Sequence, residues 1–253
     1  EQDGSHREVP VHFYYPDAEG SFPLVVFSHG AFGYYQSNFS TYAELASNGY
    51  VVAALDHPHH AFFTKDTDGK TVIVDMEFIT SAVDFSNGNM DEDRAFDLAR
   101  QWMKLRTEDE GFVLDTIKQA KEENSLSVAW STEQTSDILN VLSMTNTDKI
   151  GLMGHSMGSF LSQLYVTKYQ DLAGLILSGS TKASPVAKVG AVLASIMTAL
   201  SKDKTSPSPF MNNMAFGAYN KAFPDPRTDF DWLSRDRNMV QAYVEDSKCG
   251  FIA

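Results

Sequence analysis

The chain is poor in the features that mark several large classes of protein. Its 253 residues include one cysteine, Cys249, so no intramolecular disulfide can form and the redox compartment stays open. Its 20 basic residues are outnumbered by 33 acidic ones, and this balance excludes the basic footprint that nucleic-acid binding needs. Its apolar runs are too short to span a bilayer. We therefore expect a soluble protein, cytoplasmic or secreted, without a stable membrane span.

One pentapeptide carries most of the chemical information. The stretch 154–158 reads Gly-His-Ser-Met-Gly and fits the G-x-S-x-G nucleophile elbow, in which a serine occupies a sharp strand-to-helix turn. An apolar strand is predicted just before it, at 149–153. Gly154 and Gly158 suit the elbow because such a turn leaves no room for a Cβ on either side. We interpret Ser156 as a catalytic nucleophile.

What the chain lacks is a histidine after this motif. In this architecture the triad follows the order Ser, then Asp or Glu, then His. All seven histidines come before Ser156, namely His6, His12, His29, His57, His59, His60 and His155. The sequence therefore predicts an incomplete triad, whose acid and base are not found in these residues.

A second motif, residues 28–33, follows an early apolar strand. A His-Gly turn at this place commonly supplies one backbone N–H of an oxyanion hole, and the residue after the nucleophile supplies the other. We expect Ala31 and Met157 to be these donors, and we interpret His29 as a residue that braces the loop.

Three aromatic residues are candidates for the substrate pocket: Phe32, Phe210 and Phe216. His57, His59 and His60 do not have the spacing of a metal site, so we expect neither a metal nor a cofactor.

The alternation of strand and helix patterns predicts a doubly wound, mostly parallel α/β sheet. Core strands are predicted at 24–28, 50–56, 149–153 and 172–178, an edge strand at 9–15, and helices at 38–48, 90–121 and 134–143. We expect an α/β core over residues 1–180, with a helical insertion at about 75–145. Residues 181–253, which include an apolar helix at 186–200, are predicted to form a helical cap or lid.

With these motifs, the chain resembles the α/β-hydrolase superfamily over nearly its whole length. Its N-terminal part, to about residue 150, resembles the platelet-activating-factor acetylhydrolase and dienelactone-hydrolase-like group, through residues 28–30, 55–61 and 106–115. From the elbow onward it resembles the monoacylglycerol lipase, lysophospholipase and serine aminopeptidase-like group, through residues 154–160, 219–223, 227–236 and 249–251.

The resemblance implies hydrolysis of a carboxylic ester through a serine acyl-enzyme, without a cofactor. It implies a small-molecule or lipid ester as substrate, such as a monoacylglycerol or a lysophospholipid, and a cap that binds the acyl chain. One alternative is a short-chain acetylhydrolase or esterase of the same fold. Another is a non-catalytic hydrolase-fold module that binds a ligand. In the acetylhydrolase-like group the acid would follow Ser178 closely, and residues 179–184 hold no carboxylate.

Three hypotheses account for the missing histidine. The first, which we favour, is that the chain is a fragment without its last strands, and that it is inactive as it stands. The second is the non-catalytic binding module, although the elbow and the oxyanion turn are both intact. The third is that His57 or His59 acts as the base from an unusual position, since the strand before them ends at the same edge of the sheet.

Overall fold

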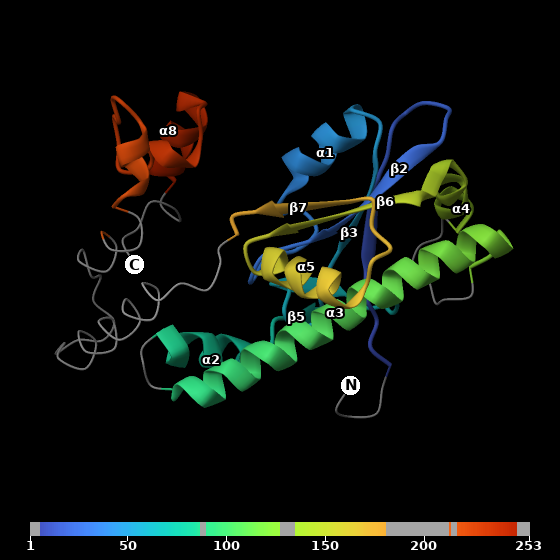
Figure 1. Cartoon of the computed structure of the whole chain (residues 1–253), viewed down its shortest axis with the longest axis horizontal. Helices are drawn as coiled ribbons and strands as arrows, with labels where there is room; N and C mark the ends of the chain where they lie inside the picture. Colours follow the sequence, from blue (N-terminus) through green and yellow to red (C-terminus); the bar gives the residue numbers. More distant parts are fainter. Residues whose placement is uncertain (1–5, 87–89, 127–134, 181–212, 214–216, 247–253) are drawn as a thin grey trace. The chain divides into compact units, whose positions relative to one another are not determined.

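A computed structural model describes residues 6–86, 90–126, 135–180, 213 and 217–246 (Figure 1). The chain divides into two compact units, Glu1–Val83 with Met90–Lys182, and Asp84–Asn89 with Ala183–Ala253. Each unit is described by itself. The helix predicted at 186–200 lies outside the described residues, and so do Phe210 and Phe216.

The first unit is built on a five-stranded sheet with the order β1-β3-β2-β6-β7. Strand β1 runs antiparallel to β3, and the other neighbouring strands are parallel. This confirms the predicted doubly wound, mostly parallel sheet with the early strand at one edge. The strands are β1 (Val11–Tyr14), β2 (Phe22–Ser28), β3 (Val51–Leu55), β6 (Thr145–His155) and β7 (Gly174–Ser178).

Helices cover both faces of this sheet. Side chains along a strand alternate between the two faces, so each strand contributes apolar side chains to both. On β2, Leu24 and Val26 pack into a core with helices α3, α4 and α5, whereas Val25 and Phe27 pack with α1 on the other face. Figure 1 shows α1 on one side of the sheet and α3 with α5 on the other. The helices of this unit are α1 (Phe39–Ser47), α2 (Met76–Ser86), α3 (Glu92–Glu123), α4 (Thr135–Met144) and α5 (Met157–Lys168).

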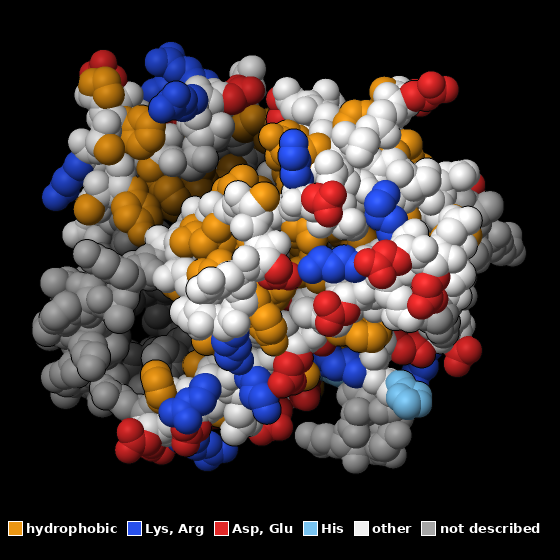
Figure 2. Space-filling model, turned by 45° about the vertical axis from the view of Figure 1, so that its right-hand side comes forward, with side chains coloured by type: hydrophobic (Ala, Val, Ile, Leu, Met, Phe, Trp, Pro, Cys, Tyr) orange, Lys and Arg blue, Asp and Glu red, His pale blue; other side chains and the backbone are white. Residues whose placement is uncertain are grey.

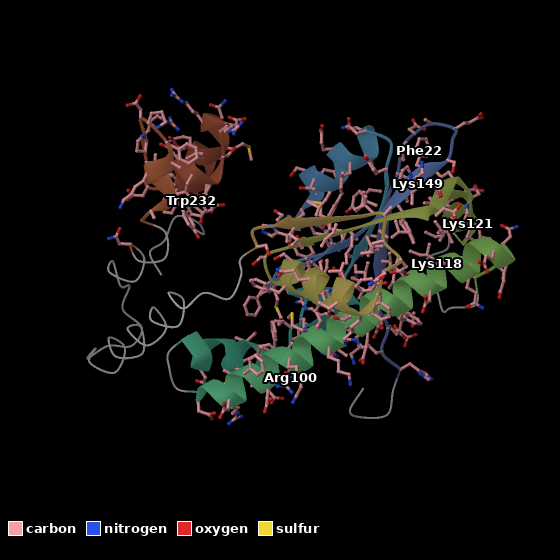
Figure 3. The ribbon with its side chains drawn as sticks, in the orientation of Figure 1. Phe22, Arg100, Lys118, Lys121, Lys149 and Trp232 are labelled. Carbon is pink, nitrogen blue, oxygen red and sulfur yellow. The ribbon has the colours of Figure 1, made fainter. Side chains whose placement is uncertain are left out.

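A small hairpin and a long helix follow β3. Strands β4 (Phe63–Lys65) and β5 (Thr71–Ile73) pair antiparallel around a turn at 66–70. Helix α3 is 32 residues long and is capped at its N-terminus by Asp91, whose side chain accepts a hydrogen bond from the amide of Arg94. Lys118 and Lys121, near its C-terminal end (Figure 3), bind Asp171 Oδ2 at 3.0 Å and the carbonyl of Leu142 at 3.1 Å. These bonds tie the helix to neighbouring segments of the unit.

The outer side of α3 is charged. Arg100 pairs with Asp97 at 3.5 Å, and Lys104 pairs with Glu108 at 3.6 Å, all four side chains being exposed. Basic and acidic side chains lie interspersed on the face that Figure 2 draws. Exposed pairs of this kind contribute about 0–1 kcal/mol each to stability, so packing on the sheet, not surface charge, holds α3 in place.

The described part of the second unit is a short run of helical turns. It contains two 3₁₀ helices, η1 (Tyr219–Ala222) and η2 (Asp231–Leu233), and helix α8 (Arg237–Glu245). The rings of Tyr219 and Trp232 lie 4.9 Å apart, and the amide of Trp232 donates to Asn220 Oδ1 at 3.0 Å. The two 3₁₀ turns are therefore packed on one another. The cap role of residues 181–253 stays a prediction.

Candidate active site

Ser156 sits in a strained turn between β6 and α5. Its backbone has φ 51° and ψ −117°, a conformation that residues other than glycine rarely adopt. The turn is held because the Ser156 amide donates to the carbonyl of Ser178 on β7 at 2.9 Å, while its carbonyl accepts the hydroxyl of Ser159 at 2.6 Å. Strain of about 1–3 kcal/mol at such a residue persists only where its surroundings enforce it. This is the geometry expected of a nucleophile elbow.

The two glycines of the motif are required by close backbone approach. A Cβ on Gly158 would lie 2.9 Å from the carbonyl oxygen of His29 and would also meet the carbonyl of Ser28. A Cβ on Gly154 would meet the carbonyl of Gly158 and the hydroxyl of Ser162. The start of α5 thus lies directly against the carboxyl end of β2, which carries the oxyanion turn.

A hollow of about 360 Å³ opens beside Ser156. Its walls bring together the predicted Ala31, Phe32 and Ser156, and the other lining residues are Gly30, Gly33, Ser37, Asn38 and His155. A Cβ placed on Gly30 would lie 3.7 Å from Ser156 Oγ, so the turn at 30–33 faces the serine hydroxyl. Met157 is the first residue of α5. Ser37 and Asn38 were not predicted, since nothing in their local sequence marks them.

Phe32 lies partly exposed in the wall of this hollow. Its φ of 57° is in the left-handed region, and its side chain is 41% exposed. Its ring lies 5.2 Å from that of Phe78 on α2, and Phe78 in turn lies 4.6 Å from Trp102 on α3. A cluster of three aromatic rings therefore begins at the wall of the hollow.

Behind the turn lies a buried array with the atom order of a catalytic triad. Ser28 Oγ is 2.9 Å from His57 Nε2, and His57 Nδ1 is 2.9 Å from Asp109 Oδ2. Arg7 closes the array by donating to both carboxylate oxygens, at 2.7 and 2.9 Å. However, Ser28 and His57 are 0% exposed and Asp109 is 3% exposed, so no substrate reaches this hydroxyl. We interpret the array as a brace.

The protonation of the array follows from its burial. Burial and the charge of Arg106 lower the pKa of His57 to about 4, although its hydrogen bond to Asp109 opposes this, so its ring is neutral at pH 7. Burial alone would raise the pKa of Asp109, but the hydrogen bonds from Arg7 and His57 hold it below its usual range. A carboxylate only accepts, so His57 Nδ1 carries the proton and Nε2 accepts from Ser28.

The hydrogen bonds of His57 and His29 indicate whether each ring acts as a base or as a brace. Both ring nitrogens of His57 are engaged, by Ser28 and Asp109, so His57 does not have the free nitrogen that a base for Ser156 needs. His29 lies buried with Nδ1 2.7 Å from the carbonyl of Gly30, and its Nε2 accepts the amide of His57 at 3.3 Å. These contacts give His29 the bracing role that the sequence suggested.

Arg106 and Glu110 complete the buried charges. Arg106 is 0% exposed and donates to the carbonyl of His29 at 3.0 Å and to His60 Nδ1 at 3.2 Å. Burial lowers its pKa to about 10, although Asp109 and Glu110 oppose this, so it stays charged at neutral pH. Burial raises the pKa of Glu110 to about 8. In the sequence, residues 106–115 serve only as carriers of a resemblance, and the burial of Arg106, Asp109 and Glu110 was not predicted.

Within the described ranges, no cluster of three or more His, Cys, Asp or Glu side chains is arranged to bind a metal ion. None of the helices in those ranges has both the length and the apolar character that a membrane crossing requires.

Two protein-family models match the chain. The model of platelet-activating factor acetylhydrolase, isoform II, matches residues 11–173. The chain belongs to this family. A second model, serine aminopeptidase S33, matches residues 134–252 and covers the elbow and the segment after it. Together with the sheet, these matches confirm the α/β-hydrolase fold and the two resemblances inferred from the sequence.

Solved structures that match this chain include an esterase and a lipase. A thermostable carboxyl esterase from Bacillus coagulans is 19% identical with a TM-score of 0.47, over 97% of this chain and 63% of the esterase. A soluble variant of monoglyceride lipase from Saccharomyces cerevisiae is 15% identical with a TM-score of 0.42, over 94% of this chain and 58% of the lipase. The chain thus spans less than two thirds of either protein. The search of curated proteins found no match.

Proposed function

We propose that this chain carries the nucleophile and the oxyanion hole of a serine hydrolase that cleaves carboxylic esters. The observation that carries the proposal is the conformation of Ser156, with φ 51° and ψ −117° at the end of β6. The flanking glycines, Gly154 and Gly158, lie where an added Cβ would meet backbone atoms, and the serine hydroxyl faces the turn at 30–33. A serine strained in this way, at the carboxyl edge of a parallel sheet, is placed for nucleophilic attack.

The reaction follows from the groups around Ser156. Its Oγ attacks the ester carbonyl, and the new C–O bond turns the carbonyl oxygen into an oxyanion. The amides of Ala31 and Met157 donate to this oxyanion, and the N-terminal end of α5 adds a favourable dipole. Collapse of the intermediate breaks the ester C–O bond, releases the alcohol and leaves an acyl-enzyme on Ser156, which water hydrolyses to the free acid.

A base must take the proton of Ser156 and return it to the leaving alcohol. Both ring nitrogens of His29 and of His57 are engaged in hydrogen bonds, and Nδ1 of His60 accepts from Arg106. We propose that a histidine outside these 253 residues supplies the base. Reading the gene beyond the codon for Ala253 tests this point. A stop codon there would contradict it, and a late histidine preceded by an acid would support it.

The substrate we propose is a lipid-type ester, a monoacylglycerol or a lysophospholipid. Supporting this is the aromatic cluster that begins with Phe32 in the wall of the hollow and continues to Phe78 and Trp102. Apolar rings at this place suit an acyl chain better than a charged group. The name of the matched family, an acetylhydrolase, favours a short acyl group as the second candidate.

Hydrolysis of p-nitrophenyl esters tests the activity and the acyl preference together. The protein expressed from the complete reading frame is assayed with acetate, butyrate and decanoate esters, then with monoacylglycerol and lysophosphatidylcholine. Ser156→Ala should abolish turnover, whereas the control Ser47→Ala, at an exposed serine on α1, should retain it. Equal turnover by Ser156→Ala would show that another residue is the nucleophile and would reject the proposal. No turnover by the wild type would reject it in favour of a binding module.

A further inference from the structure

Arg106 reaches from helix α3 to the loops that follow β2 and β3, the first of which carries the turn beside Ser156. Its guanidinium is fully buried, and Nη1 donates to the carbonyl of His29 at 3.0 Å while Nε donates to His60 Nδ1 at 3.2 Å. His29 follows β2 and His60 follows β3, so one side chain joins the loops at the carboxyl ends of two adjacent strands. The planar fork of arginine suits such a double contact, which the single amine of lysine cannot reproduce.

The carbonyl that Arg106 holds is part of the oxyanion turn. A Cβ on Gly158 would lie 2.9 Å from the same His29 oxygen, so this oxygen lies between the guanidinium and the first turn of α5. The turn then closes through the amide of Gly33, which donates to the carbonyl of Gly30 at 3.2 Å. The peptide after His29 is therefore fixed from both sides, two residues before Ala31.

Arg106 is also a positive charge placed directly behind this turn. Two acidic side chains lie near it on α3, but Asp109 is paired with Arg7 through two hydrogen bonds. Glu110 is fully buried, and its raised pKa keeps it protonated at neutral pH. Because Asp109 is shared with Arg7, its negative charge offsets the charge of the Arg106 guanidinium only in part. A fixed cation in a region of low dielectric stabilises negative charge that develops nearby.

We propose that Arg106 is a positioning residue of the oxyanion hole: it fixes the His29–Ala31 backbone and directs positive potential at the developing oxyanion. The proposal rests on the proposed function of Ser156. It predicts that loss of Arg106 weakens binding of the transition state more than binding of the substrate.

The test compares Arg106→Met and Arg106→Lys with Arg100→Met. Arg100 lies six residues earlier on α3 (Figure 3), and its side chain is exposed, stacked over Phe96 and paired with Asp97. For each variant we would measure kcat and KM on a p-nitrophenyl ester, inhibition by a boronic acid that mimics the oxyanion, and the urea midpoint. Misplacing a donor by about 1 Å costs about 10²-fold in rate.

For Arg106→Met we expect kcat to fall about 10–10²-fold, with KM nearly unchanged and boronic-acid affinity reduced by a similar factor. Arg106→Lys should recover part of both losses, and Arg100→Met should lose neither. Wild-type kcat and boronic-acid affinity in folded Arg106→Met would overturn the proposal. If Arg106→Met does not fold, Arg106→Lys decides by the same two readouts: matching losses support the proposal, and wild-type values overturn it.

A separate control distinguishes this proposal from the proposed function. If a fluorophosphonate fails to label Ser156 in the wild type, the proposed function fails, and with it the basis of the test. If it labels the wild type and Arg106→Met at the same rate, only the role of Arg106 is rejected.

Discussion

The tight contact at Gly158 makes one substitution especially informative. In Gly158→Ala the new Cβ would lie 2.8 Å from the carbonyl carbon of Ser28 and 2.9 Å from the carbonyl oxygen of His29. Both are backbone atoms, so no flexible side chain can move aside, and either β2 or α5 must shift. Forcing a methyl group into a packed interior costs about 1–3 kcal/mol. We expect the free energy of unfolding to fall by this amount.

A helical glycine without such contacts should respond in the opposite direction. Gly111, within α3, has nothing within 4 Å of the position that a Cβ would take. Gly111→Ala should therefore stabilise the protein by about 0.5–1 kcal/mol, through helix propensity alone. Gly151→Ala, on the same strand as the elbow, meets its nearest atom at 3.8 Å and should be tolerated.

The assay is urea unfolding of the three variants, followed by the rate of fluorophosphonate labelling. Only Gly158→Ala should lose both stability and reactivity, because only there does the shift reach the oxyanion turn. If Gly158→Ala were as stable and reactive as Gly111→Ala, the described packing of α5 against β2 would be wrong.

Three further predictions concern the strained and buried groups. Ser156→Gly should raise the free energy of unfolding by about 1–3 kcal/mol, since glycine adopts φ 51° without strain; an unchanged urea midpoint would contradict this. Asp109→Asn should lower it by about 3–5 kcal/mol, because it removes the charged partner of Arg7 and His57; circular-dichroism melting checks this. Glu110 has its pKa raised to about 8 from an ordinary 4.5. Between these values the unfolded state ionises while the folded state keeps its proton, so stability falls as pH rises. Glu110→Gln should therefore gain up to about 1.4 kcal/mol per pH unit over the wild type in that range, and parallel urea midpoints at pH 5 and pH 8 would refute the burial argument.

The strands and the elbow were predictable because their signals are local. A continuous apolar run marks β2 and β3, which are buried on both faces, and a glycine-flanked serine after β6 marks the turn. Helix α3 was predictable because its apolar residues recur at helical spacing. In the structure it ends two residues beyond the predicted end.

The buried charges of α3 were not predicted, although the sequence holds a signal for them. Arg106, Asp109 and Glu110 continue, at helical spacing, the apolar stripe of Val113, Leu114 and Ile117. A charge on a buried stripe needs a partner, and its partners, Arg7, His29 and His60, are far away in the sequence. Pairing over such distances depends on the fold, so the sequence alone does not specify it.

The account depends on Ser156, not Ser28, being the nucleophile. Each serine has one feature of a nucleophile. Ser156 lies in the elbow motif, and Ser28 is hydrogen-bonded to His57, which is in turn hydrogen-bonded to Asp109. The most direct test is peptide mapping of the protein after reaction with a fluorophosphonate, measured by mass spectrometry. We predict one adduct, on Ser156, that Ser156→Ala removes and Ser28→Ala keeps. An adduct on Ser28, or labelling that survives Ser156→Ala, would contradict the account.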